Sequence, residues 1–230
     1  MATQWTLEKE LCSLARTRSA GEALRRLGIV DGSPAVAQLE EVEGWTCVGE
    51  SYTYRFRVLL PQVTDELLLK AIVAFSMSRS LTELANEWLR RRRLLEGEGV
   101  LTSQLYYAGR ALFVEKFVPF RLSDQLKCQS EVPARLFDQV IGFAAILERH
   151  RFCPISPFHG LRTDGCDVFV TDFGQDLGPP GIASKRNGRL LREAVQWLER
   201  ESGQRIDRNR AKALYAFNAG DKYGEGTRWT

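Results

Sequence analysis

The sequence lacks long apolar runs. No stretch approaches the roughly 18 apolar residues that a membrane-spanning helix needs. The first residues, Met1–Glu10, contain no apolar run of the kind that a secretory signal peptide requires. We therefore expect no transmembrane segment and a cytoplasmic location, although an effector translocated by another route would have the same composition.

Cysteine pairs are also missing, and the excess of charge is small. Five cysteines are scattered without a CxxC pair, so neither a disulfide framework nor a zinc site is predicted. The formal net charge is only +3, which gives no reason to expect a nucleic-acid partner. The cysteines are Cys12, Cys47, Cys128, Cys153 and Cys166.

What remains is an ordinary globular composition with a bias toward arginine. Hydrophobic residues make up 44% and charged residues 27% of the 230 residues, which suffices for one domain or two closely packed lobes. Arg90–Arg93 form one uninterrupted run. One interpretation is a solvated helix face with a few ion pairs. The other is a patch for an anionic ligand or a protein partner, because guanidinium groups bind phosphate and carboxylate through paired hydrogen bonds.

The periodicity of apolar residues predicts both strands and helices. Residues 51–58 alternate apolar and polar side chains, which is typical of a half-buried strand, whereas residues 131–150 repeat apolar side chains at helical spacing. Asp164-Gly165 is a hairpin signal. The predicted helices are 5–28, 80–98, 131–150, 187–202 and 207–218, and the predicted strands are 42–48, 51–58, 66–75, 104–108, 111–118 and 168–171.

This order of elements predicts an α+β fold. Strands with one inserted helix come first, and helices dominate the second half. We place residues 1–230 in a single domain with a helical extension over 1–35. A strand-rich lobe would follow over 36–118 and a short helical lobe over 119–230.

Lys70 interrupts the otherwise apolar strand 66–75. A lysine there either points to solvent or is buried, and a buried ammonium group needs an acidic partner. Glu87 on the predicted helix 80–98 is our preferred partner, and Glu83 one turn earlier is the other candidate. A lysine on a strand paired with a glutamate on the next helix is the pairing that kinases use to bind nucleotide phosphates.

Asp172-Phe173-Gly174 directly follows the apolar strand 168–171. An aspartate at the end of a strand and before a glycine is either a surface turn or a carboxylate that points into a cleft, as in kinases. His159 lies before the Asp164-Gly165 hairpin and is either a divalent-metal ligand or a structural residue. Asp164 and Asp167 are more typical of turn formers than of catalysts.

In this order of parts the chain resembles the protein-kinase-like superfamily. The resemblance covers about residues 42–178 and is closest to bacterial lipopolysaccharide core (Kdo/heptose) kinases and aminoglycoside phosphotransferases. It is carried by Glu87-Trp88-Leu89, by the segment Tyr107–Glu115, by the helix over 131–150 and by Asp172-Phe173-Gly174. It implies a reduced two-lobed kinase-like fold with a β-rich N-lobe, which contains one helix, and a short helical C-lobe.

The resemblance also implies site residues and cofactors. ATP and Mg²⁺ would be bound, with Lys70, Glu87 and Asp172 as catalytic residues and with His159 beside Asp172 as a metal ligand. The segment that contains Glu115 and Phe117 would contact the nucleotide, as the hinge of a kinase does, although an edge strand is an equally good interpretation of these residues alone.

The loop that carries the catalytic aspartate in kinases departs from the family pattern. Aligned from His150-Arg151, the aspartate position holds Phe152; aligned from the hairpin, it holds Pro154 and the asparagine position holds His159. Neither alignment supplies a carboxylate, and no GxGxxG loop is present. We therefore expect an atypical phosphotransferase whose acceptor is a sugar, a lipid head group or a protein hydroxyl. The alternatives are a pseudokinase that senses nucleotide or binds a protein, and an unrelated α+β interaction domain.

Overall fold

The structure, a computed structural model, describes most of the chain from Gln38 onward. The described residues belong to two compact units. Unit 1 comprises Met1–Arg90 and Ser103–Phe117, and unit 2 comprises Arg91–Thr102 and Val118–Thr230. The residues described are 38–46, 51–59, 67–74, 81–110, 112–174, 177 and 188–220.

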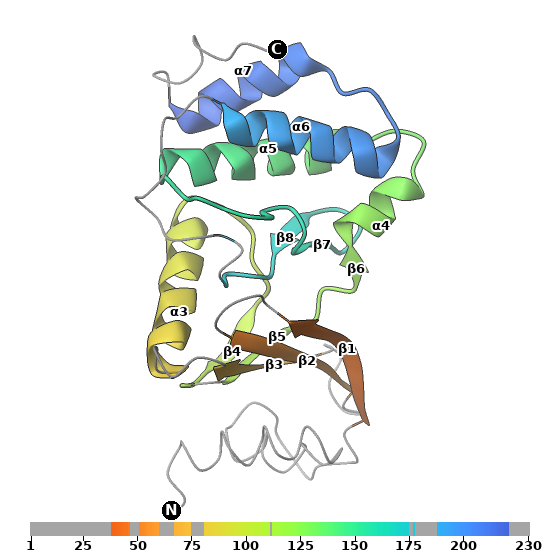
Figure 1. The fold of residues 1–230 in the computed structure, drawn as a ribbon. Helices are drawn as coiled ribbons and strands as arrows, with labels where there is room; N and C mark the ends of the chain where they lie inside the picture. Colours follow the sequence, from red (N-terminus) through yellow and green to blue (C-terminus); the bar gives the residue numbers. More distant parts are fainter. Residues whose placement is uncertain are drawn as a thin grey trace, which may run out of the picture. The chain divides into compact units, whose positions relative to one another are not determined.

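Unit 1 contains a five-stranded antiparallel sheet with the strand order β1-β2-β3-β5-β4 (Figure 1). The predicted alternation over residues 51–58 lies in β2, so the half-buried strand expected there is confirmed as a strand. The strands are β1 Gln38–Thr46, β2 Ser51–Leu59, β3 Leu67–Ala74, β4 Leu105–Ala108 and β5 Leu112–Lys116.

Helix α3, Leu81–Gly97, starts in unit 1 and continues into unit 2. Within unit 1, Leu84 and Trp88 are one helical turn apart and both are buried. The Trp88 ring stacks on the ring of Phe113 from β5, with 4.2 Å between the ring centroids. Phe113 is fully buried, so this stacked pair anchors α3 to the sheet of unit 1.

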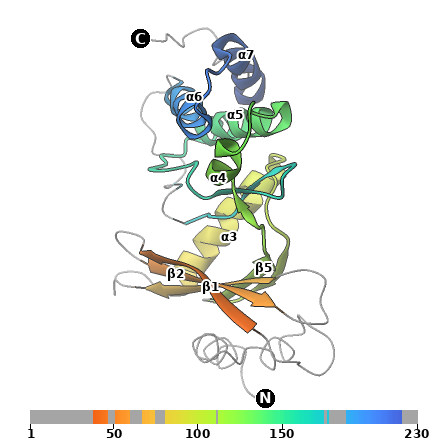
Figure 2. The same ribbon diagram turned by 90° about the vertical axis from the view of Figure 1, so that its right-hand side faces the viewer.

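Unit 2 combines helices with a small antiparallel sheet of order β6-β7-β8. The three longer helices α5, α6 and α7 pack side by side in both views (Figures 1 and 2). The elements are β6 Phe120–Arg121, α4 Leu122–Lys127, α5 Ala134–Arg149, β7 Leu161–Thr163, β8 Val168–Val170, α6 Arg189–Ser202 and α7 Arg208–Ala219.

A buried carboxylate joins these three helices. Glu148 of α5 accepts a hydrogen bond from the hydroxyl of Tyr215 of α7, and its other oxygen accepts the N–H of Gly188 at 3.0 Å. Gly188 precedes α6 and has a positive φ of 68°, which favours glycine. Burial, and then the negative charge of Glu148, raise the pKa of Tyr215 above its ordinary value. One glutamate therefore satisfies polar groups from two other elements.

The α+β fold class predicted from the sequence is confirmed. Helices α3, α6 and α7 agree with the predicted bounds to within two residues, whereas β1 begins at Gln38, four residues before the predicted start at residue 42. The sequence analysis missed β6, α4 and β7, because elements of two to six residues are too short to show a period. Helix α5 begins at Ala134 rather than at residue 131, since Pro133 precedes it as the N-cap residue. The predicted helix over 5–28 lies outside the described residues.

Candidate functional site

The β7–β8 hairpin positions the residues that the sequence singled out. Its tight turn is closed by the Asp164 carboxylate, which accepts the backbone N–H groups of Cys166 and Asp167, both at 2.9 Å. Burial opposes ionisation of Asp164, but these backbone hydrogen bonds outweigh it and lower the pKa of the carboxyl group. Gly165 follows with a φ of 103°, a conformation that a residue with a side chain rarely adopts. The interpretation of Asp164 as a turn former is confirmed.

His159 and Asp172 lie at the opposite, open end of this hairpin. The last paired residues are Leu161 and Val170, and His159 and Asp172 each stand two residues beyond them. The Thr171 hydroxyl donates a hydrogen bond to the Gly160 carbonyl oxygen at 3.0 Å, which keeps the two chains together past the end of the strands. The hairpin register therefore brings His159 and Asp172 to one end of the same small sheet.

Gly160 allows this close approach. A Cβ atom added at Gly160 would lie 2.9 Å from the Cβ of Asp172, which is closer than two such atoms can stand. The Asp172 carboxylate in turn accepts the N–H of Gly174 at 3.0 Å, so the aspartate fixes the conformation of the residues that follow it.

Two arginines of α3 hold the Asp172–Gly174 segment within unit 2. The Arg91 guanidinium donates to the carbonyl oxygens of Phe173, at 3.1 Å, and of Gly174. The Arg92 guanidinium carbon lies 5.7 Å from the centroid of the Phe173 ring, and this ring is fully buried. Arg92 also donates to Glu96 at 2.7 Å. We call Arg91 and Arg92 the arginine clamp.

The clamp corrects the interpretation of the Arg90–Arg93 run as one solvated face. Arg91 and Arg92 are only 5% and 3% exposed, whereas Arg90 and Arg93 are exposed. Residues 91 and 92 are buried because, at helical spacing, they continue the buried stripe of Leu84, Trp88 and Leu95. The same spacing could have identified the two buried arginines from the sequence.

The loop between α5 and β7 brings no carboxylate to the hairpin end. Phe152 and Pro154, the two residues that the family alignment places at the catalytic aspartate, are both buried. The Pro154 carbonyl oxygen accepts a hydrogen bond from Arg189 at 3.2 Å. Just before them, His150 and Arg149 both bind Glu98, with 2.7 Å between the His150 ring and the carboxylate.

Lys70 and Glu87 are both placed in unit 1, on β3 and α3. The Cα partner of Lys70 on β5 is Phe113, the residue whose ring stacks on Trp88, and Glu87 precedes Trp88. Glu87 is partly buried, while the side chain of Lys70 lies outside the described part of the structure. The predicted ion pair between them stays a prediction.

Glu115 and Phe117 lie at the end of unit 1. The Glu115 carboxylate is fully buried and accepts a hydrogen bond from the Ser103 hydroxyl at 2.7 Å. The neighbouring N–H of Lys116 donates to the carbonyl oxygen of Gln104 at 2.8 Å. Phe117 is the last residue of unit 1 and is partly buried. The Glu115 side chain therefore belongs to the interior of unit 1, so nucleotide contacts of this segment would have to use other groups.

No group of three or more histidine, cysteine or acidic side chains that could hold a metal ion occurs among the described residues. Asp172 and His159 are thus two candidate ligands rather than a complete set. Mg²⁺ is commonly bound by one or two carboxylates together with phosphate oxygens of the substrate and water. The Asp172 carboxylate fits that pattern, and the His159 imidazole is the less usual ligand of the two.

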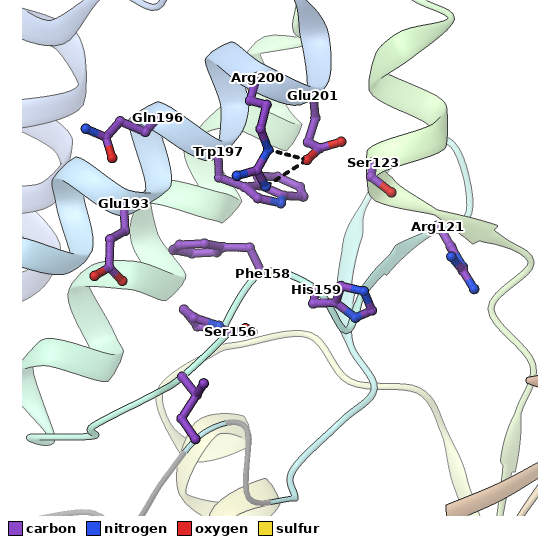
Figure 3. A pocket seen from close by; sticks show the side chains of 12 residues that line it. Arg121, Ser123, Ser156, Phe158, His159, Glu193, Gln196, Trp197, Arg200 and Glu201 are labelled. Carbon is purple, nitrogen blue, oxygen red and sulfur yellow. Dashed lines mark hydrogen bonds and ion pairs between the residues drawn. The ribbon is translucent and has the colours of Figure 1, made fainter. Parts of the chain in front are cut away.

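A pocket of about 410 Å³ lies beside His159 within unit 2 (Figure 3). One side is formed by a single stripe of α6, whose members recur at helical spacing from Glu193 to Glu201. The loop Ile155–His159 forms a second side, and Arg121 and Ser123 form a third. The α6 stripe comprises Glu193, Gln196, Trp197, Arg200 and Glu201.

Of the residues that line this pocket, the sequence analysis named only His159. The α6 stripe was missed because a polar helix face is usually just the solvent-exposed side of an amphipathic helix. Arg121 and Ser123 were missed because β6 and α4 are too short to be predicted. Only the folded chain brings these three segments together.

The three described cysteines, Cys128, Cys153 and Cys166, are free thiols and exposed, in line with the absence of paired cysteines in the sequence. Among the described helices, none has the length and apolar character needed to cross a membrane. In the comparison with known proteins, no protein-family model matches this chain and no curated protein is recognisably similar to it.

Proposed function

We propose that the chain is an atypical kinase-like phosphotransferase that binds ATP and Mg²⁺ and transfers phosphate to a hydroxyl group. The observation that carries this proposal is the register of the β7–β8 hairpin, which places His159 and Asp172 each two residues beyond its last pair, at the open end. In the kinase pattern that the sequence resembles, these two positions hold the metal ligands. The close approach of Gly160, the residue after His159, to Asp172 supports the alignment that places His159 at the metal-binding position.

The arrangement of unit 1 supports the same proposal. Residues directly opposite each other on neighbouring antiparallel strands share one face of the sheet. Lys70 stands opposite Phe113, and Phe113 contacts α3 through Trp88. This register is what a pair between Lys70 and Glu87 of α3 requires. Unit 1 also ends at Phe117, within the segment that the resemblance to kinases implies as the hinge.

In the proposed reaction, each of the candidate site residues has one role. The acceptor hydroxyl oxygen attacks the γ-phosphorus of ATP, a new O–P bond forms, the bond to the β–γ bridging oxygen breaks, and ADP leaves. Lys70 would neutralise phosphate charge and Glu87 would orient Lys70, while Asp172 and His159 would hold Mg²⁺, which neutralises the charge that develops on the phosphates. The hydroxyl proton passes to water, because the loop 150–161 offers no carboxylate.

A pseudokinase is the second candidate, and one observation favours it. Phe152 and Pro154 are buried and the Pro154 carbonyl oxygen binds Arg189, so the usual position of the catalytic base is closed. General-base assistance is typically worth about 10²–10⁴-fold in rate. We therefore expect ATP binding to be readily measurable and turnover to be slow.

Titration calorimetry with ATP and Mg²⁺ on the full chain tests the proposal. Asp172→Asn should weaken Mg²⁺-dependent ATP binding at least tenfold, which is about 1.4 kcal/mol. The matched control is Asp164→Asn at the other end of the same hairpin, where asparagine also suits the turn and binding should not change. Equal affinity of Asp172→Asn and wild type would refute the site. Wild-type ATP binding with no transfer to any hydroxyl compound would favour the pseudokinase.

A further inference from the structure

The pocket beside His159 has a chemical character that identifies a class of ligand. Its volume of about 410 Å³ falls within the range of small-molecule sites and corresponds to one or two sugar-sized rings. It lies entirely within unit 2, and its lining includes both loop residues that could position an acceptor hydroxyl, Ser156 and His159. Ser156 and His159 belong to one tight turn, since the His159 N–H donates to the Ser156 carbonyl oxygen at 3.3 Å.

Positive and negative side chains line the pocket in equal number. Two arginines, Arg121 and Arg200, and two glutamates, Glu193 and Glu201, line it. Glu201 lies 2.8 Å from the Arg200 guanidinium, an ion pair drawn in Figure 3. Glu193 lies 2.6 Å from the guanidinium of Arg189, which precedes it by one helical turn. A ligand with a large net charge of either sign would find no matching excess here, because specific binding of such ligands requires opposite charge in the site.

The lining is rich in groups that can exchange hydrogen bonds with hydroxyls. Ser123, Ser156 and Gln196 each offer both a donor and an acceptor, and they come from three different segments of unit 2. Gln196 is exposed on α6, one residue before Trp197. Neutral hydrogen-bonding groups that converge from several sides are what an uncharged ligand with many hydroxyls needs.

Long apolar chains fit the pocket poorly. Its aromatic residues are embedded in the core, with Trp197 only 8% exposed and its ring 5.7 Å from that of Phe158. Ile155 is the one strongly exposed apolar side chain of the lining, at 79%. An acyl chain or an apolar peptide segment would therefore also cover polar groups of the lining and leave them without hydrogen bonds.

We infer that this pocket is the acceptor site and that it takes an uncharged polyhydroxylated molecule, a neutral sugar or a cyclic polyol. The acceptor role rests on the proposed phosphotransferase function, whereas the choice of ligand rests on the lining alone. The ligand hydroxyl would lie beside Ser156 and His159, on the side of the hairpin end where Asp172 stands.

Saturation-transfer NMR and titration calorimetry on the full chain test the inference without ATP. The neutral probes are glucose, galactose, maltose, lactose and myo-inositol; the charged counterparts are glucose 6-phosphate and glucosamine. At least one neutral probe should bind with a Kd in the millimolar range or below. Gln196→Ala should weaken that binding at least fivefold, and Gln125→Ala, a glutamine on α4 outside the pocket lining, should leave it unchanged.

Three results would overturn the inference. The first is that no neutral probe binds at ~20 mM, a concentration well above an ordinary KM. The second is that a charged counterpart binds ten times more tightly than its neutral parent. The third is that Gln196→Ala and Gln125→Ala bind equally well. A parallel titration with ATP and Mg²⁺ separates the two proposals. ATP binding without polyol binding would refute only the inferred ligand of this pocket. Polyol binding without ATP binding would support the inferred ligand class but refute its role as a phosphate acceptor.

Discussion

Replacing Arg91 by methionine should destabilise unit 2 and release the Asp172–Gly174 segment. Arg91 is 5% exposed and donates two hydrogen bonds to main-chain carbonyl oxygens, those of Phe173 and Gly174. Hydrogen bonds that involve a charged group contribute about 1.5–3 kcal/mol each. Methionine has a similar length but cannot donate, so the buried carbonyl oxygen of Phe173 and the partly buried one of Gly174 would lose this partner.

The expected loss is smaller than the sum of the two bonds. Methionine removes the cost of burying a guanidinium group, which offsets part of the penalty. We expect the free energy of unfolding to fall by about 2–4 kcal/mol, because two bonds of about 1.5–3 kcal/mol are lost against that gain. For a chain of this size each kcal/mol lowers the melting temperature by about 2–4 °C. The melting temperature should therefore fall by roughly 5–15 °C.

Two measurements distinguish this account from a general loss of stability. The control is Arg90→Met, the same chemical change at the preceding, exposed position of α3, which should stay within about 0.5 kcal/mol of wild type. Hydrogen exchange of the Gly174 amide, which donates to Asp172, should accelerate in Arg91→Met more than exchange in α7 does. Arg91→Lys keeps the charge but loses the two-pronged geometry, and should fall between the two. The reasoning is refuted if Arg91→Met and Arg90→Met unfold at the same temperature.

Two further substitutions test contacts within unit 2. Tyr215→Phe removes the hydroxyl that binds Glu148 and should lower the free energy of unfolding by about 1–3 kcal/mol in urea titrations. Because the pKa of Tyr215 is raised in the fold, its contribution is complete below the ordinary pKa of 10.0 and is lost as the pH rises above it. Wild type should therefore lose more stability than Tyr215→Phe between pH 9 and pH 11 (about one unit either side of that pKa), and parallel pH curves would contradict this. Gly160→Ala should cost about 1–3 kcal/mol and weaken Mg²⁺-dependent ATP binding, because the new methyl group would meet Asp172 at 2.9 Å. Gly142→Ala, where the nearest atoms are at 3.8 Å, is the matched control, and equal stability of the two variants would exclude the close approach.

The long elements of the fold could be predicted because their side-chain periods are local properties of the sequence. The alternation in residues 51–58 and the apolar repeat in 131–150 specify a strand and a helix without reference to the rest of the chain. β6 and α4 could not be predicted in this way. β6 forms by pairing with β7, with Phe120 opposite Thr163 and Arg121 opposite Arg162, and α4 packs against α6 and β7. These contacts join residues far apart in sequence.

The candidate site, too, has a part that the sequence predicts and a part that only the folded chain shows. The hairpin itself follows from the turn signal at Asp164-Gly165. Its register, which places His159 and Asp172 each two residues beyond the last pair, does not, because the turn spans residues 164–167. Helical spacing marks positions 91 and 92 as part of the buried stripe of α3, but it does not show which oxygens the two guanidinium groups meet. A buried guanidinium is stable only when carbonyl or carboxylate oxygens are already positioned around it, and that is a property of the folded chain.

The arginine clamp and the β7–β8 hairpin together bear on how the proposed site differs from the active site of an ordinary kinase. The loop 150–161 has no carboxylate, yet Asp172 remains fixed by its own bond to the Gly174 N–H, and Arg91 holds the two residues that follow. A segment retained only as a surface turn would not require a buried guanidinium, because burying that charge is costly unless its hydrogen bonds are made. Such a cost in folding free energy is commonly tolerated where the geometry that it maintains serves a function. Under the proposed function, an ordered Asp172 and a loop without a carboxylate would give a molecule that binds nucleotide but transfers phosphate slowly. The ratio of ATP affinity to turnover in wild type and Asp172→Asn is the quantity that decides between the proposed enzyme and the pseudokinase.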